Sequence, residues 1–207
     1  MNSKTVITIG RQFGSGGKEI GEKLAKELGI RCYDKELLAV AAKESGLCKE
    51  LFENHDEKPT NSFLYSLVMD TYSLGYTSSY SDMPINHKVF LAQFDAIKKL
   101  AERESCVIIG RCADYALEDN PYAMSIYIKA DMDKRVKRIM TKYQLNESKA
   151  SDMIQKEDKR RASYYNYYSS KKWGDAKSYD LCLDSGKLGV EGSIEPVSYT
   201  HLTLPTT

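Results

Sequence analysis

A glycine-rich run at residues 10–17 constrains the fold of this chain more than any other feature. Residues 5–9, before the run, read Thr-Val-Ile-Thr-Ile, and residues 18–28, after it, carry apolar side chains about every four positions. The uncharged, β-branched segment is typical of a strand buried on both faces of a parallel sheet, and the periodic segment of an amphipathic helix. Gly29 then marks a common kind of helix end. The run therefore connects a buried strand to a helix N-terminus.

This order of strand, glycines and helix predicts a phosphate-binding loop. Glycines let several backbone N–H groups point at one anion, and the helix N-terminus adds partial positive charge. A flexible turn is the alternative, but four glycines followed by a lysine favour phosphate binding. The expected phosphate-binding residues are Arg11, Gly14, Ser15, Gly16, Gly17, Lys18 and Glu19.

The loop departs from the usual GxxxxGK[ST] pattern. With Lys18 as its lysine, the pattern needs glycine at position 12 and Ser or Thr at position 19, where Gln12 and Glu19 stand. Without that hydroxyl, magnesium must be held by phosphate oxygens, water and another carboxylate. We assign no residue as a metal ligand in its own right.

The rest of the chain alternates strand-like and helix-like segments. Further strands are predicted at 30–33, 106–109, 125–129 and 179–183, and helices at 34–45, 89–101, 133–142 and 147–165. This alternation predicts a three-layer α/β fold with a five-stranded parallel sheet. Residues 46–88, with a Tyr/Ser-rich stretch, lack clear periodicity and are expected to form an insertion, either functional or a plain surface loop.

Length and composition indicate one domain over residues 1–195. The formal charge of +1 argues against a dedicated nucleic-acid binder, and no apolar stretch approaches the roughly 18 residues needed to span a membrane. An odd cysteine count without CxxC pairs or an export signal predicts a cytoplasmic protein with reduced thiols. Residues 196–207 have no helical period and resemble a translated sequencing adapter, so we expect a non-native, disordered tail.

Three segments together resemble the cytidylate kinase-like family. They are residues 9–20, Tyr33-Asp-Lys-Glu-Leu-Leu38, and Ile109-Gly-Arg-Cys-Ala-Asp114. The resemblance, over roughly residues 4–192, implies a P-loop nucleoside monophosphate kinase with ATP at the glycine loop, an acceptor-binding insertion at 46–88 and a helical lid at 133–172. A gapless comparison places the family's P-loop lysine at Gly17. Lys18 must then reach the phosphates from one residue further on, or Arg11 must supply the charge.

Arg111 follows a buried strand, at the edge where α/β folds bind ligands. Its planar guanidinium suits a phosphate, although a surface arginine at a strand end is the alternative. Cytidylate kinases have Gly-Arg-Asp here, whereas this chain has Cys112 and then Asp114. The resemblance implies that Asp34, Arg111 and Asp114 bind the acceptor.

A second basic group lies in the two helices predicted after residue 132. The resemblance implies lid arginines here, and Arg135, Arg138 and Arg161 would stabilise the transferred charge together with Lys18. A solvated helix face is the alternative. The aromatic residues at 164–168 would suit stacking on single-stranded nucleic acid, but more often such residues pack a helix onto the core.

The sequence therefore predicts ATP- and Mg²⁺-dependent phosphoryl transfer to a nucleoside monophosphate, CMP or dCMP first. No general base is required, because the acceptor phosphate is already anionic. Two alternatives stay open: a kinase for another small acceptor, and a degenerate kinase that senses nucleotide without turning it over. The expected partners are small nucleotides, and the sequence does not indicate an oligomeric state.

Overall fold

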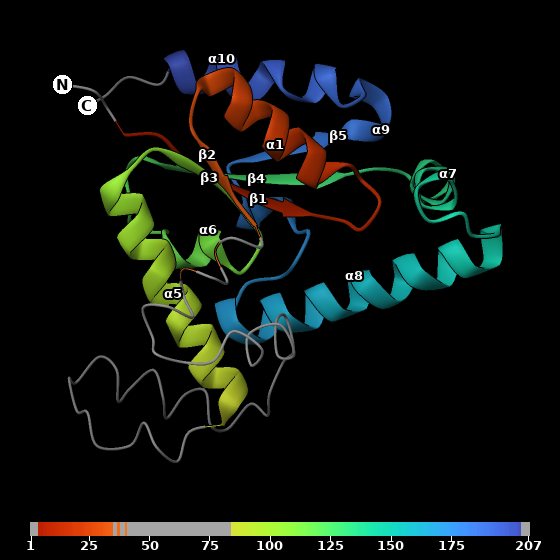
Figure 1. Ribbon diagram of the computed structural model, residues 1–207, viewed down its shortest axis with the longest axis horizontal. Helices are drawn as coiled ribbons and strands as arrows, with labels where there is room; N and C mark the ends of the chain where they lie inside the picture. Colours follow the sequence, from red (N-terminus) through yellow and green to blue (C-terminus); the bar gives the residue numbers. More distant parts are fainter. Residues whose placement is uncertain (1–3, 35–36, 38–39, 41–83, 204–207) are drawn as a thin grey trace.

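The computed structural model describes residues 4–34, 37, 40 and 84–203. Five parallel strands form one sheet in the order β2-β3-β1-β4-β5, which confirms the predicted α/β fold with its five-stranded sheet (Figure 1). The strands are β1 (Val6–Arg11), β2 (Arg31–Tyr33), β3 (Cys106–Ile109), β4 (Ala123–Lys129) and β5 (Leu181–Asp184).

The central strand β1 sets the register of the sheet. Ile9 lies beside Ile109 of β3 on one side and beside Ile126 of β4 on the other. Because all strands are parallel, their carboxyl ends meet at one edge. The residues that follow β1, β2 and β3 therefore converge at that edge, where α/β folds bind ligands.

Helices cover both faces of the sheet (Figure 1). On one face lie α1 (Gly17–Leu28), α9 (Ser185–Leu188) and α10 (Glu195–Thr203), and on the other lie α5 (Ile85–Arg103), α6 (Ala113–Ala116) and α8 (Glu147–Ser169). Helix α7 (Met132–Tyr143) lies beside the sheet and packs on the far end of α8. Two short 3-10 helices, Ala176–Ser178 and Glu191–Ser193, flank β5.

Side chains of β1 point alternately to the two faces of the sheet and pack into two separate hydrophobic cores. Ile7 and Ile9 pack with α1, whereas Val6 packs with α5. All three are buried to 1% exposure or less. At about 25 cal/mol per Å² of apolar surface removed from water, this double-sided burial is the main driving force that holds the sheet between its helix layers.

The aromatic run of α8 packs onto the core, as the commoner of the two interpretations predicted. Tyr164, Tyr165 and Tyr168 are buried, and the Tyr168 ring stacks on Phe90 of α5 with centroids 4.0 Å apart. These three rings are covered by protein, so they do not form an exposed platform for bases.

Two predicted segments have different outcomes. Residues 46–83 of the expected insertion lie outside the described residues, and so does most of the helix predicted at 34–45.

The expected disordered tail is corrected over residues 196–203, which belong to helix α10. Pro196 stands in the first turn, where its missing N–H costs nothing, and Val197 is fully buried against the α1 cluster. No helix among the described residues is long and apolar enough to cross a membrane.

The burial of Val197 gives a test of whether α10 belongs to the fold. Val197→Ala should lower the free energy of unfolding by about 2 kcal/mol, because a fully buried side chain loses its packing. Urea unfolding followed by circular dichroism measures the change. Tyr199→Ala is the matched control, since Tyr199 is 69% exposed on the same helix and should cost less than about 0.5 kcal/mol. Equal stability of Val197→Ala and the wild type would mean that α10 adds nothing to the core.

Candidate functional site

The glycine loop joins β1 to α1 in a conformation that only glycine adopts easily at two positions. Gly14 and Gly16 have φ of 79° and 82°, and Gly16 caps the N-terminus of α1. Ser15 is fully buried, and its hydroxyl donates to the Gln12 carbonyl at 2.9 Å. The same hydroxyl accepts the Gly17 N–H at 3.3 Å, so the Ser15 side chain shapes the loop from within. The N-terminus of α1 adds partial positive charge, which favours an anion here.

A cleft of about 1010 Å³ opens over this loop. Its walls come from the loop, the first turns of α1, Asp34, helix α7 and Arg161 of helix α8. That volume matches the upper range of small-molecule sites and accommodates a nucleotide. The charged residues that line it are Arg11, Lys18, Glu19, Glu22, Asp34, Lys137, Arg138, Lys142 and Arg161.

The three arginines predicted for the lid all donate to carbonyl groups of the loop. Arg138 Nη1 lies 3.0 Å from the Gly14 oxygen, and Arg135 Nη1 lies 3.3 Å from the Phe13 oxygen. Arg161 Nη1 lies 3.2 Å from the Arg11 oxygen. The structure thus brings these residues to the glycine loop, and it shows how helices α7 and α8 hold the backbone of the loop.

Asp158 anchors the loop to α8, a role that the sequence analysis did not assign. Its Oδ1 accepts the Phe13 N–H at 2.7 Å, and its Oδ2 pairs with Arg135 Nη1 at 2.5 Å. Asp158 precedes Arg161 by three positions, a spacing that puts both on one helix face, so the pattern carried a usable signal. Arg135 is only 8% exposed and is absent from the described lining of the cleft, which favours a structural role over direct contact with a nucleotide.

Lys18, Asp34 and Arg111 meet at the carboxyl edge of the sheet, between α1 and β3. Lys18 Nζ donates to Asp34 Oδ2 at 2.8 Å, and Arg111 Nη2 lies 3.8 Å from Asp34 Oδ1. Burial alone would raise the pKa of Asp34, but the hydrogen bond from Lys18 and the charges of Arg111 and Arg11 hold it below its usual value. Asp34 is therefore an ionised carboxylate that holds two cations in place.

Arg111 is held at this edge by an unusual backbone. It is 6% exposed, and both Arg111 and Cys112 have left-handed φ values of 62° and 54°. Such values cost energy for residues other than glycine and cluster at functional sites. A small pocket of about 20 Å³ lies here, bordered by Arg111, Arg11, Arg161 and aromatic side chains of α8.

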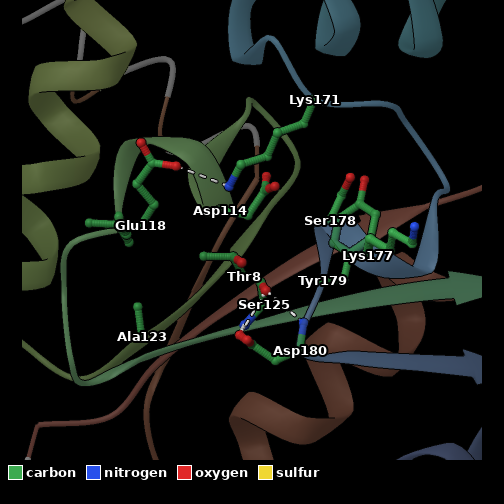
Figure 2. A pocket seen from close by; sticks show the side chains of 11 residues that line it. Thr8, Asp114, Glu118, Ala123, Ser125, Lys171, Lys177, Ser178, Tyr179 and Asp180 are labelled. Atoms are coloured by element: carbon green, nitrogen blue, oxygen red, sulfur yellow. Dashed lines mark hydrogen bonds and ion pairs between the residues drawn. The ribbon is translucent and has the colours of Figure 1, made fainter.

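Asp114, the third predicted acceptor residue, also lines this pocket. Burial raises the pKa of its carboxyl group, although the Tyr165 hydroxyl donates to its Oδ2 at 2.6 Å. Asp114 also borders a separate polar cavity of about 240 Å³, together with Thr8 and the ion pair between Glu118 and Lys171 (Figure 2). The hydrogen bond from Tyr165 of α8 to Asp114 favours a structural role for Asp114. It positions α6, the helix that follows Arg111 in the chain.

Comparison with known proteins assigns the chain to a family. The model of the cytidylate kinase-like family matches residues 6–187. The chain belongs to the cytidylate kinase-like family. No curated protein matches it in sequence.

Solved structures share the fold of this chain. An uncharacterised protein from Eubacterium ventriosum is 32% identical, with a TM-score of 0.71, over 97% of this chain and 99% of that one. Shikimate kinase from Bacteroides thetaiotaomicron is 14% identical, with a TM-score of 0.54, over 95% and 97% of the two chains. A gluconokinase from Sinorhizobium meliloti is also 14% identical, with a TM-score of 0.51, over 99% and 97%. At such low identity these two kinases show the fold alone: this cytidylate kinase-like protein has the P-loop kinase fold.

The buried pair between Asp158 and Arg135 gives a stability test. Asp158→Ala should lower the free energy of unfolding by about 3 kcal/mol, because it leaves the Arg135 charge buried and the Phe13 N–H without its acceptor. Glu157→Ala is the matched control, since Glu157 pairs with the half-exposed Arg160 and should cost less than about 1 kcal/mol. Urea unfolding compares the two variants, and equal losses would contradict the anchoring role of Asp158.

Proposed function

We propose that this protein transfers the γ-phosphoryl group of Mg-ATP to a nucleoside monophosphate, with CMP or dCMP as the first acceptors to test. One observation carries the proposal. The large cleft over the glycine loop and the small pocket at Arg111 share two lining residues among those described, Arg11 and Arg161. Two sites that meet at a pair of arginines suit a group that carries negative charge from one site to the other.

The donor half of the site would hold the phosphates of ATP. The glycine loop and the N-terminus of α1 would face the anion, and a cation from Arg11 or Lys18 would neutralise its charge. Arg138 and Arg161 already line the same cleft. They would move from the loop carbonyls to phosphate oxygens as charge develops during transfer.

Magnesium fits this site as a companion of ATP rather than as a resident ion. The described residues contain no group of three or more His, Cys, Asp or Glu side chains able to hold a metal. Glu19 and Glu22 border the cleft and offer carboxylate oxygens, the ligand type that Mg²⁺ accepts alongside phosphates and water. When bound, the ion would neutralise charge on the β- and γ-phosphates.

The acceptor half would be organised by Arg111 and Asp34. The Arg111 guanidinium matches two phosphate oxygens at once, and its ion pair with Asp34 fixes its direction. The small pocket marks where the acceptor phosphate would approach, and the body of the acceptor would lie outside it. An acceptor phosphate oxygen then bonds to the γ-phosphorus while the bond to the leaving ADP oxygen breaks. No proton needs to be removed, because the attacking oxygen is already ionised.

Family membership and the arginines favour a phosphorylated acceptor over an uncharged alcohol. The neighbours named as shikimate kinase and gluconokinase share this fold, so their acceptors are the natural competitors in a test. The substrates would be nucleotides of the cytoplasm.

A coupled ADP-release assay tests the proposal with Mg-ATP and separate CMP, dCMP, UMP, AMP, shikimate and gluconate acceptors. We expect release that depends on CMP or dCMP. Arg111→Ala should raise the acceptor KM at least tenfold and leave the KM for ATP within about twofold, because one charge-assisted phosphate contact contributes about 1.5–3 kcal/mol. Arg103→Ala is the control, since Arg103 is 59% exposed at the end of α5.

Three outcomes would contradict the proposal in different ways. Release with shikimate or gluconate alone would indicate a kinase for another small acceptor. ATP binding without release for any acceptor would indicate a nucleotide sensor. An unchanged acceptor KM in Arg111→Ala would remove Arg111 from the acceptor site.

A further inference from the structure

We propose that Arg11 takes the place of the P-loop lysine as the cation on the transferred phosphoryl group. This inference rests on the proposed function and assigns one residue within it. It accounts for the absence of a lysine from the first position of α1, because Arg11 would supply the positive charge instead.

The sequence contains an exchange of residue types across the loop. In the pattern GxxxxGK the lysine follows the first glycine by six positions and stands at the start of the helix. Helix α1 starts at Gly17, with Gly16 as its cap. The lysine position therefore holds glycine, and the position six residues earlier, where the pattern has glycine, holds Arg11.

The two positions compete for the same space. A Cβ built on Gly17 would lie 2.6 Å from the Cβ of Arg11, closer than real Cβ contacts come, and 3.2 Å from its Cγ. The Arg11 side chain thus fills the volume that a side chain at position 17 would occupy. Glycine at position 17 thus leaves room for the arginine at position 11. The positive charge at the site then comes from a side chain of strand β1 instead of from one of helix α1.

The Arg11 side chain then runs along the border between the two halves of the site. Its Nη1 lies 2.1 Å from the position of a Cβ built on Gly110, so its guanidinium rests against the carboxyl end of β3. Gly110 has a φ of 75°, and it leaves room for this close approach. Arg11 borders both the donor cleft and the pocket at Arg111.

Lys18 already forms ion pairs with two carboxylates. Its ammonium group lies 2.8 Å from Asp34 and 3.6 Å from Glu22, and the hydrogen bond to Asp34 is the main reason that its pKa is raised. Two carboxylates offset its charge, which makes it a poor partner for a triphosphate. Lys18 is therefore better placed to orient Asp34, and through it Arg111.

The chemistry at Arg11 requires no proton transfer. Its guanidinium is always charged and donates two parallel hydrogen bonds to phosphate oxygens. As the acceptor oxygen bonds to the γ-phosphorus and ADP leaves, these hydrogen bonds stay on the moving phosphoryl group. A cation at the border between the two halves can therefore stay in contact with the phosphoryl group from donor to acceptor.

Moving the cation back to the helix tests the assignment. Arg11→Gly should lower kcat about 100-fold or more, the usual effect of removing one preorganised donor at a transition state. The double variant Arg11→Gly with Gly17→Lys restores the common pattern, and we expect it to regain at least tenfold over Arg11→Gly. Gly17→Lys alone should lose activity or stability, because its side chain collides with Arg11. Arg31→Ala, at a 67% exposed arginine of β2, is the control for arginine loss, and circular dichroism checks folding.

Calorimetric titration with Mg-ATP and with ADP needs no acceptor, so it separates this inference from the proposed function. Arg11→Gly should weaken ATP at least tenfold and ADP less. That result with no transfer to any acceptor would leave the Arg11 assignment standing and overturn the proposed acceptors. Wild-type ATP affinity in Arg11→Gly would overturn the assignment. So would a double variant that folds but gains nothing, or a Lys18→Ala variant that loses more activity than Arg11→Gly.

Discussion

The Asp158 carboxylate carries the interaction on which the site depends. One oxygen accepts a backbone N–H of the glycine loop and the other holds the buried Arg135, so a single side chain joins the loop to both α7 and α8. Hydrogen bonds to charged groups are worth about twice those between neutral groups, and this one lies where water is largely excluded. The helices that carry Arg138 and Arg161 are therefore positioned by the same contact that fixes the backbone of the loop.

Positive charge gathers at one edge of the sheet, and the fold makes this possible. Parallel strands end together, so the carboxyl ends of β1 and β3 meet although one hundred positions separate Arg11 from Arg111. Arg11 and Arg111 would repel each other there without compensation. The Asp34 carboxylate at the end of β2 supplies this compensation, and the hydrogen bond from Lys18 together with the charges of both arginines keeps it ionised. An anionic substrate would enter a site whose cations are already arranged and partly balanced, which lowers the cost of organising them during transfer.

Local patterns were enough to predict the sheet and the loop. The β-branched run before Gly10 and the apolar period after Gly17 correspond to β1 and α1, because both signals reflect burial that the sheet imposes on each segment. The roles of single residues in and around the loop depend on tertiary contacts, which local sequence patterns do not contain. The overlap of Arg11 with position 17 involves the far side of a turn, and the pairing of Asp158 with Phe13 spans 145 positions. Helix α10 escaped prediction for a related reason, since the tertiary burial of Val197 outweighs its weak local pattern.

The central claim is that a donor site and an acceptor site meet at Arg11 and Arg161. Calorimetric titration with a compound in which ATP and CMP share one polyphosphate chain tests it most directly. Two adjacent sites predict that the joined compound binds at least about 100-fold more tightly than ATP, because the second half binds at high effective concentration. An affinity equal to that of ATP alone would mean that the pocket at Arg111 is not an acceptor site in line with the donor cleft.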